Sequence, residues 1–326
     1  MLHTRHINQG FDRGRMSGLA LTTLVMILAA GCGGEKKSQS GGEPVIASTT
    51  PVAATDPGRD VGGDVGSLER VAFDYAETAY KEKRYGEAVR MFTTYVDQRP
   101  DNRWGHYMLG LSAWKSGDLV SAESAFVRTL EVDPRHLKSL LNLSRVLLEQ
   151  GQPKAARARV TAALSVDSTS GEAYRLLGRI RNALNQPNEA MAAYRMALSL
   201  DPTDTWSMNN LGLILIQQQR YEESLAPLAR AVQLDSGMAV FQNNLGIALE
   251  HTGRFGLATT AYHAAIAGDS GYTKAVLSLA RVDGRTEDTT LMPLDLASLA
   301  ASFDGEIRTA KVSATVTKKD TVPPER

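Results

Sequence analysis

The sequence has a single cysteine, Cys32, among its 326 residues. One cysteine excludes an internal disulfide and any metal site built from several cysteine ligands. Aromatic residues make up only 6% of the chain, and 36 basic residues balance 36 acidic ones. This zero net charge gives no indication of a nucleic-acid partner. Hydrophobic residues nevertheless reach 43%, and with so few aromatics this composition favours packed helices over a β-sandwich.

Motifs that carry catalytic chemistry are also missing. The chain has neither a glycine-rich phosphate loop nor a Gly-x-Ser-x-Gly nucleophile motif. Ser112 and Lys115 match the Ser-x-x-Lys pattern of penicillin-binding enzymes, but the partner motifs are absent, so we interpret the match as coincidence. The histidines after the first ten residues lack the spacing of metal ligands: His106, His136, His251 and His263. We therefore expect a protein that is not an enzyme and needs no cofactor or metal.

The first 31 residues have the pattern of a secretory signal peptide. Arg5, Arg13 and Arg15 form a basic start, and an apolar run follows from Leu19 to Ala30. This run is too short for a permanent membrane helix and ends at small residues, as a cleavable signal does. We predict that residues 1–31 direct the chain out of the cytoplasm.

The residues around Cys32 resemble the lipobox of bacterial lipoproteins, with Leu28-Ala29-Ala30-Gly31 before the cysteine. The resemblance implies acylation of Cys32, cleavage before it, and a lipid anchor facing the periplasm or exterior. In this family an Asp after the cysteine accompanies inner-membrane retention, so Gly33 favours an outer membrane. The alternative is an ordinary signal peptide with an accidental cysteine.

A flexible tether follows the anchor. Residues 32–68 are rich in Gly, Ser, Thr and Pro and have almost no large apolar side chain. Such a segment cannot bury enough surface to offset its ordering entropy.

From Glu69 the chain repeats every 34 residues. The six repeats are 69–102, 103–136, 137–170, 171–204, 205–238 and 239–272. Positions 8 and 20 always hold small residues, which predicts closely crossing helices. Position 8 has Ala76, Gly110, Ser144, Gly178, Gly212 and Gly246. We expect large residues to fill space beside the crossings, at position 7 (Tyr75, Leu109, Leu143, Leu177, Leu211, Leu245) and at position 24 (Phe92, Phe126, Val160, Tyr194, Leu228, Tyr262).

This pattern resembles the tetratricopeptide repeat family over residues 69–272. The resemblance implies an all-α, right-handed superhelical solenoid of six pairs, each with a helix A and a helix B, and with the A helices lining a concave groove. Residues 273–283 continue the helix A pattern, so we predict a solvating cap helix there. We expect residues 284–326 to be mostly disordered, apart from a short amphipathic helix at 294–303.

Within the family, helix A positions 2, 5, 6, 9, 12 and 13 line the groove, and three groups of side chains occupy them here. The aromatic candidates are Tyr80, Trp104, Tyr107, Trp114 and Trp206. Large aromatic side chains are enriched at binding hot spots. The alternative is that they pack between neighbouring A helices.

The amide candidates are Asn142, Asn209, Asn210, Asn243 and Asn244. Such a column can bind a peptide backbone, because an amide donates and accepts at once. It resembles the asparagine ladder in the tetratricopeptide part of O-GlcNAc transferase, although Leu176 interrupts it. The basic candidates are Lys138, Arg145, Arg175 and Arg179. They are suited to a carboxylate or an acidic segment. For both groups the alternative is a solvated helix face.

These features lead to two functional hypotheses. The first is a membrane-anchored, extracytoplasmic scaffold that binds other proteins or extended peptides in its groove, during assembly of a pilus, a secretion pore or the outer membrane. The second is a regulatory subunit of a cell-wall or glycan-acting enzyme, or such an enzyme itself. Neither hypothesis includes a nucleic-acid partner.

Overall fold

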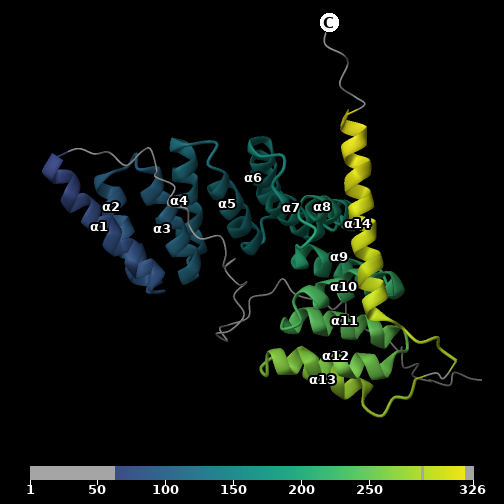
Figure 1. Ribbon diagram of the computed structural model, residues 1–326. Helices are drawn as coiled ribbons and strands as arrows, with labels where there is room; N and C mark the ends of the chain where they lie inside the picture. Colours follow the sequence, from purple (N-terminus) through teal and green to yellow (C-terminus); the bar gives the residue numbers. More distant parts are fainter. Residues whose placement is uncertain (1–62, 288–289, 320–326) are drawn as a thin grey trace, which may run out of the picture. The chain divides into compact units, whose positions relative to one another are not determined.

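The structure is a computed structural model that describes residues 63–287 and 290–319. The predicted signal peptide, Cys32 and nearly all of the predicted tether lie outside these residues. In the part that is described, the chain forms fourteen α-helices and no strand (Figure 1).

The first twelve helices form six consecutive pairs. Their bounds are α1 Gly63–Lys81, α2 Tyr85–Gln98, α3 Arg103–Ser116, α4 Leu119–Val132, α5 Leu137–Glu149, α6 Pro153–Val166, α7 Gly171–Ala183, α8 Pro187–Leu200, α9 Thr205–Gln217, α10 Tyr221–Leu234, α11 Ala239–His251 and α12 Phe255–Gly268. Each helix packs on the next one, and each odd-numbered helix also contacts the next odd-numbered helix. These contacts confirm the predicted all-α fold of stacked helix pairs.

The helices begin where the sequence period places repeat starts, with one exception. Helices α3, α5, α7, α9 and α11 each start at the first residue of a repeat. Helix α1 starts at Gly63 rather than Glu69, so it extends into the segment expected to be tether. The odd-numbered helices are therefore the A helices and the even-numbered ones the B helices.

Local sequence signals explain the helix ends. The side chains of Asn102, Asp118, Ser170 and Asp204 cap α3, α4, α7 and α9 by accepting a hydrogen bond from a backbone N–H of the first turn. Gly117, one of the glycines between helices A and B, has a φ of 86°, in the region where a Cβ is strained.

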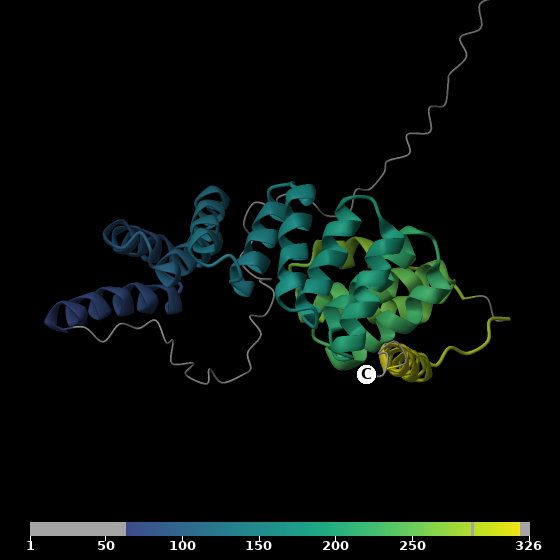
Figure 2. The same cartoon turned by 90° about the horizontal axis from the view of Figure 1, so that it is seen from above.

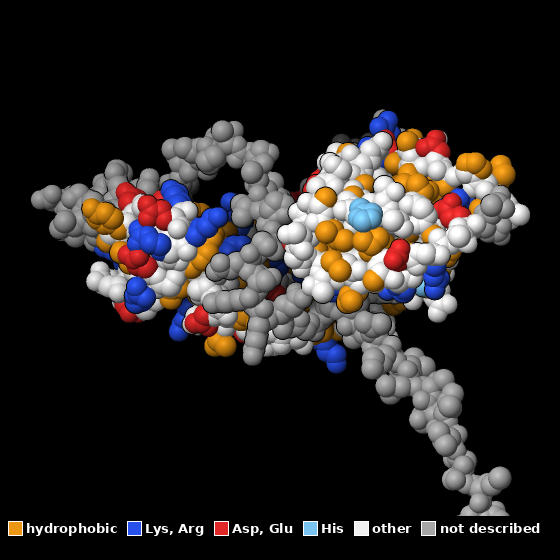
Figure 3. All heavy atoms as spheres, turned by 90° about the horizontal axis from the view of Figure 1, so that it is seen from below, with side chains coloured by type: hydrophobic (Ala, Val, Ile, Leu, Met, Phe, Trp, Pro, Cys, Tyr) orange, Lys and Arg blue, Asp and Glu red, His pale blue; other side chains and the backbone are white. Residues whose placement is uncertain are grey.

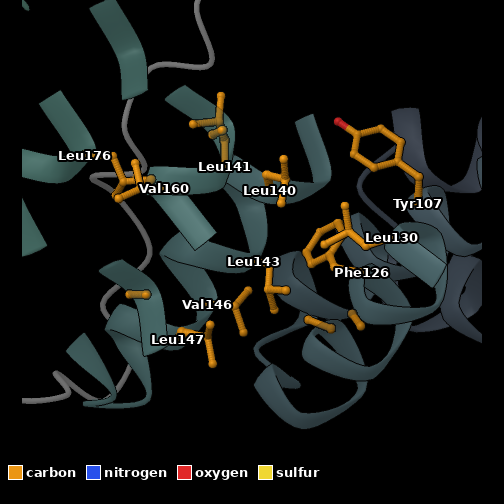
Figure 4. Packing of buried hydrophobic residues seen from close by; sticks show 14 of the residues in the cluster. Tyr107, Phe126, Leu130, Leu140, Leu141, Leu143, Val146, Leu147, Val160 and Leu176 are labelled. Atoms are coloured by element: carbon orange, nitrogen blue, oxygen red, sulfur yellow. The ribbon is translucent and has the colours of Figure 1, made fainter. Parts of the chain in front are cut away.

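The core runs between the helix pairs, and Figure 4 shows the part formed by Tyr107, Phe126, Leu143 and their neighbours. At position 7, Leu143, Leu177, Leu211 and Leu245 are buried as expected. Leu109 is half-buried, and Tyr75 is the exception, because 63% of its surface is exposed. The expectation that it fills core space was wrong. No described helix precedes α1 to cover this side, as helix B of the previous repeat does elsewhere.

Helix α13 (Thr273–Val282) covers the last pair where the cap was predicted. It buries Ala275, Ser278 and Val282 against α11 and α12. Its exposed side is mixed, since Lys274 and Arg281 are exposed there together with Val276 and Leu277, which are 45% and 65% exposed. The helix therefore covers the core, but only part of its outer surface is the polar surface of a solvating cap.

The segment after α13 differs from the prediction. In place of a short helix at 294–303, helix α14 runs from Leu296 to Lys319. It packs on α10 and α8, and Figure 2 views it nearly along its axis beside these helices. Ala300, Phe303 and Ile307 are buried at helical spacing, and Asp304 forms an ion pair with Arg230 of α10. The predicted helix ended at residue 303, too early, because the prediction did not include Ile307 in the apolar side of the helix.

Candidate functional site

The side chains at positions 2, 5, 6, 9, 12 and 13 of the odd-numbered helices form one surface, which we call the odd-helix face. The stacking of α1, α3, α5, α7, α9, α11 and α13 aligns these positions from one repeat to the next. Because helices A and B alternate, a side chain at position 5 of one A helix contacts the side chain at position 6 of the next A helix, 35 residues later in the chain. The candidate residues of the sequence analysis all lie here.

The aromatic candidates combine packing with partial exposure. Trp104 lies against Tyr107, with ring centroids 5.2 Å apart, and Trp206 meets Phe241 edge-on at 5.1 Å. Trp114 donates from its indole nitrogen to Glu149, at 2.9 Å. The three tryptophans are half-buried. One part of each tryptophan side chain therefore packs within the stack, and another part remains exposed.

Tyr107 is the buried member of this group. It receives a long hydrogen bond of 3.4 Å from Asn142 on the next odd-numbered helix. Burial raises the pKa of Tyr107 to about 12, so the phenol stays protonated at neutral pH. Tyr80 is half-buried and lies 5.6 Å from the Tyr85 ring. Tyr107 thus joins repeats, whereas Tyr80 keeps an accessible edge.

The asparagine column is mostly interior. Asn142, Asn209, Asn243 and Asn244 are buried, and only Asn210 is half-exposed. The side-chain amide nitrogen of Asn244 donates to the side-chain oxygen of Asn209 at 2.9 Å. Asn142, Asn209 and Asn244 form hydrogen bonds across neighbouring helices, and Asn243 is buried with no hydrogen-bond partner for its side-chain oxygen, so a solvated face describes none of the four. Asn210 alone keeps the exposure that a peptide-binding amide needs.

The interruption at Leu176 has a physical reason. Position 5 of one repeat meets position 6 of the next, and the two residues match in polarity. Leu141 and Leu176 are buried in the same apolar cluster, whereas Tyr107 bonds Asn142 and Asn209 bonds Asn244. This matching at a spacing of 35 residues was a signal in the sequence that the column joins repeats.

The basic candidates are largely paired. Arg145 donates to Asn142 at 2.6 Å and forms an ion pair with Glu172. Arg175 lies 3.7 Å from the Asp204 carboxylate. Lys138 is exposed and Arg179 is half-buried. These four cations lie on α5 and α7. The carboxylates of Glu172 and Asp204 lie on the same surface and reduce its net positive charge.

Half-exposed aliphatic residues are the feature that the sequence analysis missed. They occupy positions 9 and 12 of the odd-numbered helices: Leu111, Leu148, Leu213, Ile216 and Ile247. With Tyr80 and Trp114 they form an apolar strip along the odd-helix face, interrupted by Arg145 and Arg179. The signal was available, since both positions had been assigned to this face and apolar residues recur there.

Family models described as tetratricopeptide repeat match four stretches of the chain, residues 73–135, 113–180, 171–204 and 193–226. No curated protein matches the sequence.

Solved structures share the fold. A tetratricopeptide repeat protein from Parabacteroides merdae is 12% identical with a TM-score of 0.56, over 66% of this chain and 84% of that one. A chain of the Cut9–Hcn1 hetero-tetramer of the APC/C is 17% identical with a TM-score of 0.58, over 66% of this chain and 42% of that one. At such identities the likeness concerns the fold alone.

The described residues offer neither a metal site nor a membrane-spanning helix. The residues that the structure describes include no group of three or more His, Cys, Asp or Glu side chains arranged to hold a metal ion. None of the helices in the described ranges combines the length and apolar character needed to cross a membrane.

Proposed function

Since the chain is a tetratricopeptide repeat protein, a scaffold for protein–protein interactions, we propose that it binds segments of partner proteins along the odd-helix face. We further propose that a lipid on Cys32 anchors it outside the cytoplasm, where it takes part in assembling a cell-envelope complex such as a pilus, a secretion pore or the outer-membrane machinery. The apolar strip is the single observation that carries the binding proposal.

The strip has the composition of a binding surface. Trp114 and Leu148 are half-exposed on neighbouring A helices, and Ile216 and Ile247 continue the strip in the last two repeats. A solvated helix face would have polar residues at these positions. Half-exposed tryptophan and aliphatic side chains bury further apolar area when a partner covers them, which is the main source of affinity in protein interfaces.

The charges between the two apolar stretches favour an acidic partner segment. Lys138 is exposed, and the guanidinium groups of Arg145 and Arg175 already lie near carboxylates of this chain. An incoming carboxylate can share these groups, because a guanidinium offers several donors in one plane. The proposed ligand is therefore an extended segment with apolar residues on either side of an acidic one.

The binding proposal is tested with Trp114→Ala after a partner has been identified by cross-linking in the membrane fraction. Affinity should fall by about 2 kcal/mol, roughly thirtyfold, as for hot-spot aromatics. Tyr75→Ala is the matched control, because Tyr75 is exposed but lies away from the strip. Equal affinity of the wild type and Trp114→Ala would refute the assignment of the strip.

The anchor is tested separately with Cys32→Ser in a bacterial host. We expect the variant to lose incorporation of labelled palmitate and to remain unprocessed, because lipoprotein maturation needs the cysteine thiol. Mature-sized, labelled Cys32→Ser protein would contradict the lipid anchor while leaving the binding proposal intact.

A further inference from the structure

Among the described helices, α13 ends the stack as a helix A that is followed by no helix B. Counting its residues as a seventh repeat, Val276 stands at position 4 and Ala280 at position 8. At position 4 of the second to sixth repeats, His106, Leu140, Met208 and Gln242 are buried and Tyr174 is half-buried, whereas Ala72 of the first repeat is exposed. Position 8 of the second to sixth repeats is buried as well. On α13 both positions are exposed.

An open cleft of about 560 Å³ lies beside these residues. Val276, Leu279 and Ala280 of α13 line one side, and Phe255, Thr259 and His263 of α12 line the other. Figure 3 views the molecule from the side on which α12 and α13 lie, and hydrophobic side chains are exposed there. The α13 side of this cleft is the surface on which a seventh helix B would pack, because each B helix of the chain packs on the A helix of its own repeat.

The part of the C-terminal segment that the structure describes lines the cleft only at Asp283, Gly284 and Arg285. Arg254 donates to the Met292 carbonyl oxygen at 2.7 Å, and the Gly256 N–H donates to Glu287 at 3.0 Å. These bonds hold the segment at the start of α12, and α14 then packs on α10 and α8. Helix α14 also lacks the helix B pattern, in which a small residue precedes a large one by four positions, as Ala258 precedes Tyr262.

We propose that the exposed side of α13 is a docking site for one amphipathic helix of a partner protein, which completes a seventh repeat. The A–B contacts of this chain define the chemistry of that helix. In the first repeat position 8 is an alanine, as on α13, and Ala76 is buried in one cluster with the large Phe92 of position 24. The partner helix therefore presents an aromatic or large aliphatic residue to Ala280.

A second copy of the chain fits less well than a partner helix. Helix α13 has ten residues and is about 15 Å long. Each B helix of this chain packs on the A helix of its own repeat, so the repeat geometry defines one helix, rather than a flat surface of a second copy, as the occupant. A single inserted helix matches both the length and the width of α13.

The test uses the full-length chain and a synthetic helix B. The probe is a fluorescent peptide of residues 253–270, which carries Ala258 and Tyr262, with a side-chain staple on its opposite side because short helices are marginal in water. We expect saturable, one-to-one binding measured by fluorescence anisotropy. Replacing Tyr262→Ala in the peptide should weaken binding about tenfold.

Two variants of the chain locate the binding. Ala280→Trp fills the docking site and Val276→Asp places a charge in it, so each should weaken peptide binding about tenfold or more. Ala301→Trp is the matched control, because Ala301 is an exposed alanine on α14. Circular dichroism should show unchanged helicity for all three variants.

Three outcomes would overturn the proposal. They are no binding up to about 1 mM peptide, binding that Ala280→Trp and Val276→Asp leave unchanged, and a dimer in sedimentation experiments that Ala280→Trp abolishes, which would assign the site to a second copy. Trp114→Ala should leave peptide binding unchanged, so failure of the odd-helix face and failure of the α13 site are distinguishable.

Discussion

At the scale of single residues, the repeat depends on pairs that share one volume. Position 8 of helix A faces position 24 of helix B, and a Cβ added to Gly178 would lie 2.5 Å from the Tyr194 ring. Where position 8 holds the larger Ser144, position 24 holds the smaller Val160. Close packing of the interior explains this compensation, because there is no free space for both side chains to be large.

Gly178→Ala should therefore destabilise the protein by about 1–3 kcal/mol, since the Tyr194 ring is buried and cannot move aside. Chemical denaturation measures the effect. Gly86→Ala is the control: nothing lies within 4 Å of its added Cβ, so stability should stay equal or rise by up to about 1 kcal/mol. If Gly178→Ala is equally costly in a Tyr194→Val background, the shared-volume explanation fails.

The buried asparagines lead to a second residue-scale prediction. Asn244→Ala removes the donor to the Asn209 carbonyl oxygen and leaves a buried acceptor without this bond, which costs about 1–3 kcal/mol. The double variant Asn209→Leu with Asn244→Leu copies the apolar pair Leu141 and Leu176, so it should be more stable than Asn244→Ala alone. Thermal unfolding of the three proteins decides the matter, and a double variant less stable than the single one would refute polarity matching.

At the scale of helices, one carboxylate joins the end of the stack. Glu250 of α11 is buried and accepts hydrogen bonds from Tyr262 of α12 at 2.8 Å and from Arg281 of α13 at 2.6 and 2.7 Å. Burial alone would raise the pKa of Glu250, but the hydrogen bonds from Arg281 and Tyr262 outweigh it, and the pKa lies below the usual 4.5.

A carboxylate with a depressed pKa stabilises the fold above its unfolded-state pKa and loses this effect as the pH falls through its folded-state pKa. Glu250→Gln should thus lower the melting temperature at pH 7, by the equivalent of about 1 kcal/mol. The difference from the wild type should shrink as the pH falls below 4.5. Glu306→Gln, at an exposed position, is the control, and a difference that persists unchanged at pH 3 would contradict the role of the charge.

At the scale of the whole molecule, α14 joins residues that are distant in the sequence. Phe303 and Ile307 share an apolar cluster with Met191 of α8 and with Ala231 of α10. Position 21 of helix B is apolar in Met191 and Leu225, on the two B helices that α14 covers, and in Val89 of α2, whereas Glu123, Arg157 and Thr259 are charged or polar. On α8 and α10 an apolar residue is thus present at this position where α14 packs.

Phe303→Ala should detach α14 and destabilise the protein by about 3 kcal/mol, a loss that cannot exceed the free energy with which α14 docks. Hydrogen exchange should become faster in α14 and in the parts of α8 and α10 beneath it, and remain unchanged in α3 to α6. Ser302→Ala, at an exposed neighbouring position, is the control. Uniform loss of protection across all helices would mean that α14 is needed for the whole fold.

The sequence by itself determined the helix pairs and their register. A 34-residue period depends on local helix length and on small residues at crossings, which are visible in one chain. It also placed the tryptophans and cations on one face, because positions three and four apart share a helix side.

Only the tertiary structure decided which of these side chains remain accessible. Asn209 and Asn244 are as polar as Asn210, yet a neighbouring helix buries the first two, and burial depends on contacts about 35 residues away. The same reason applies to Tyr75, which lies at a core position that none of the described helices covers, and to α14, whose length and place depend on packing against α8 and α10. Helix periodicity is local information, whereas accessibility depends on which surfaces meet in space.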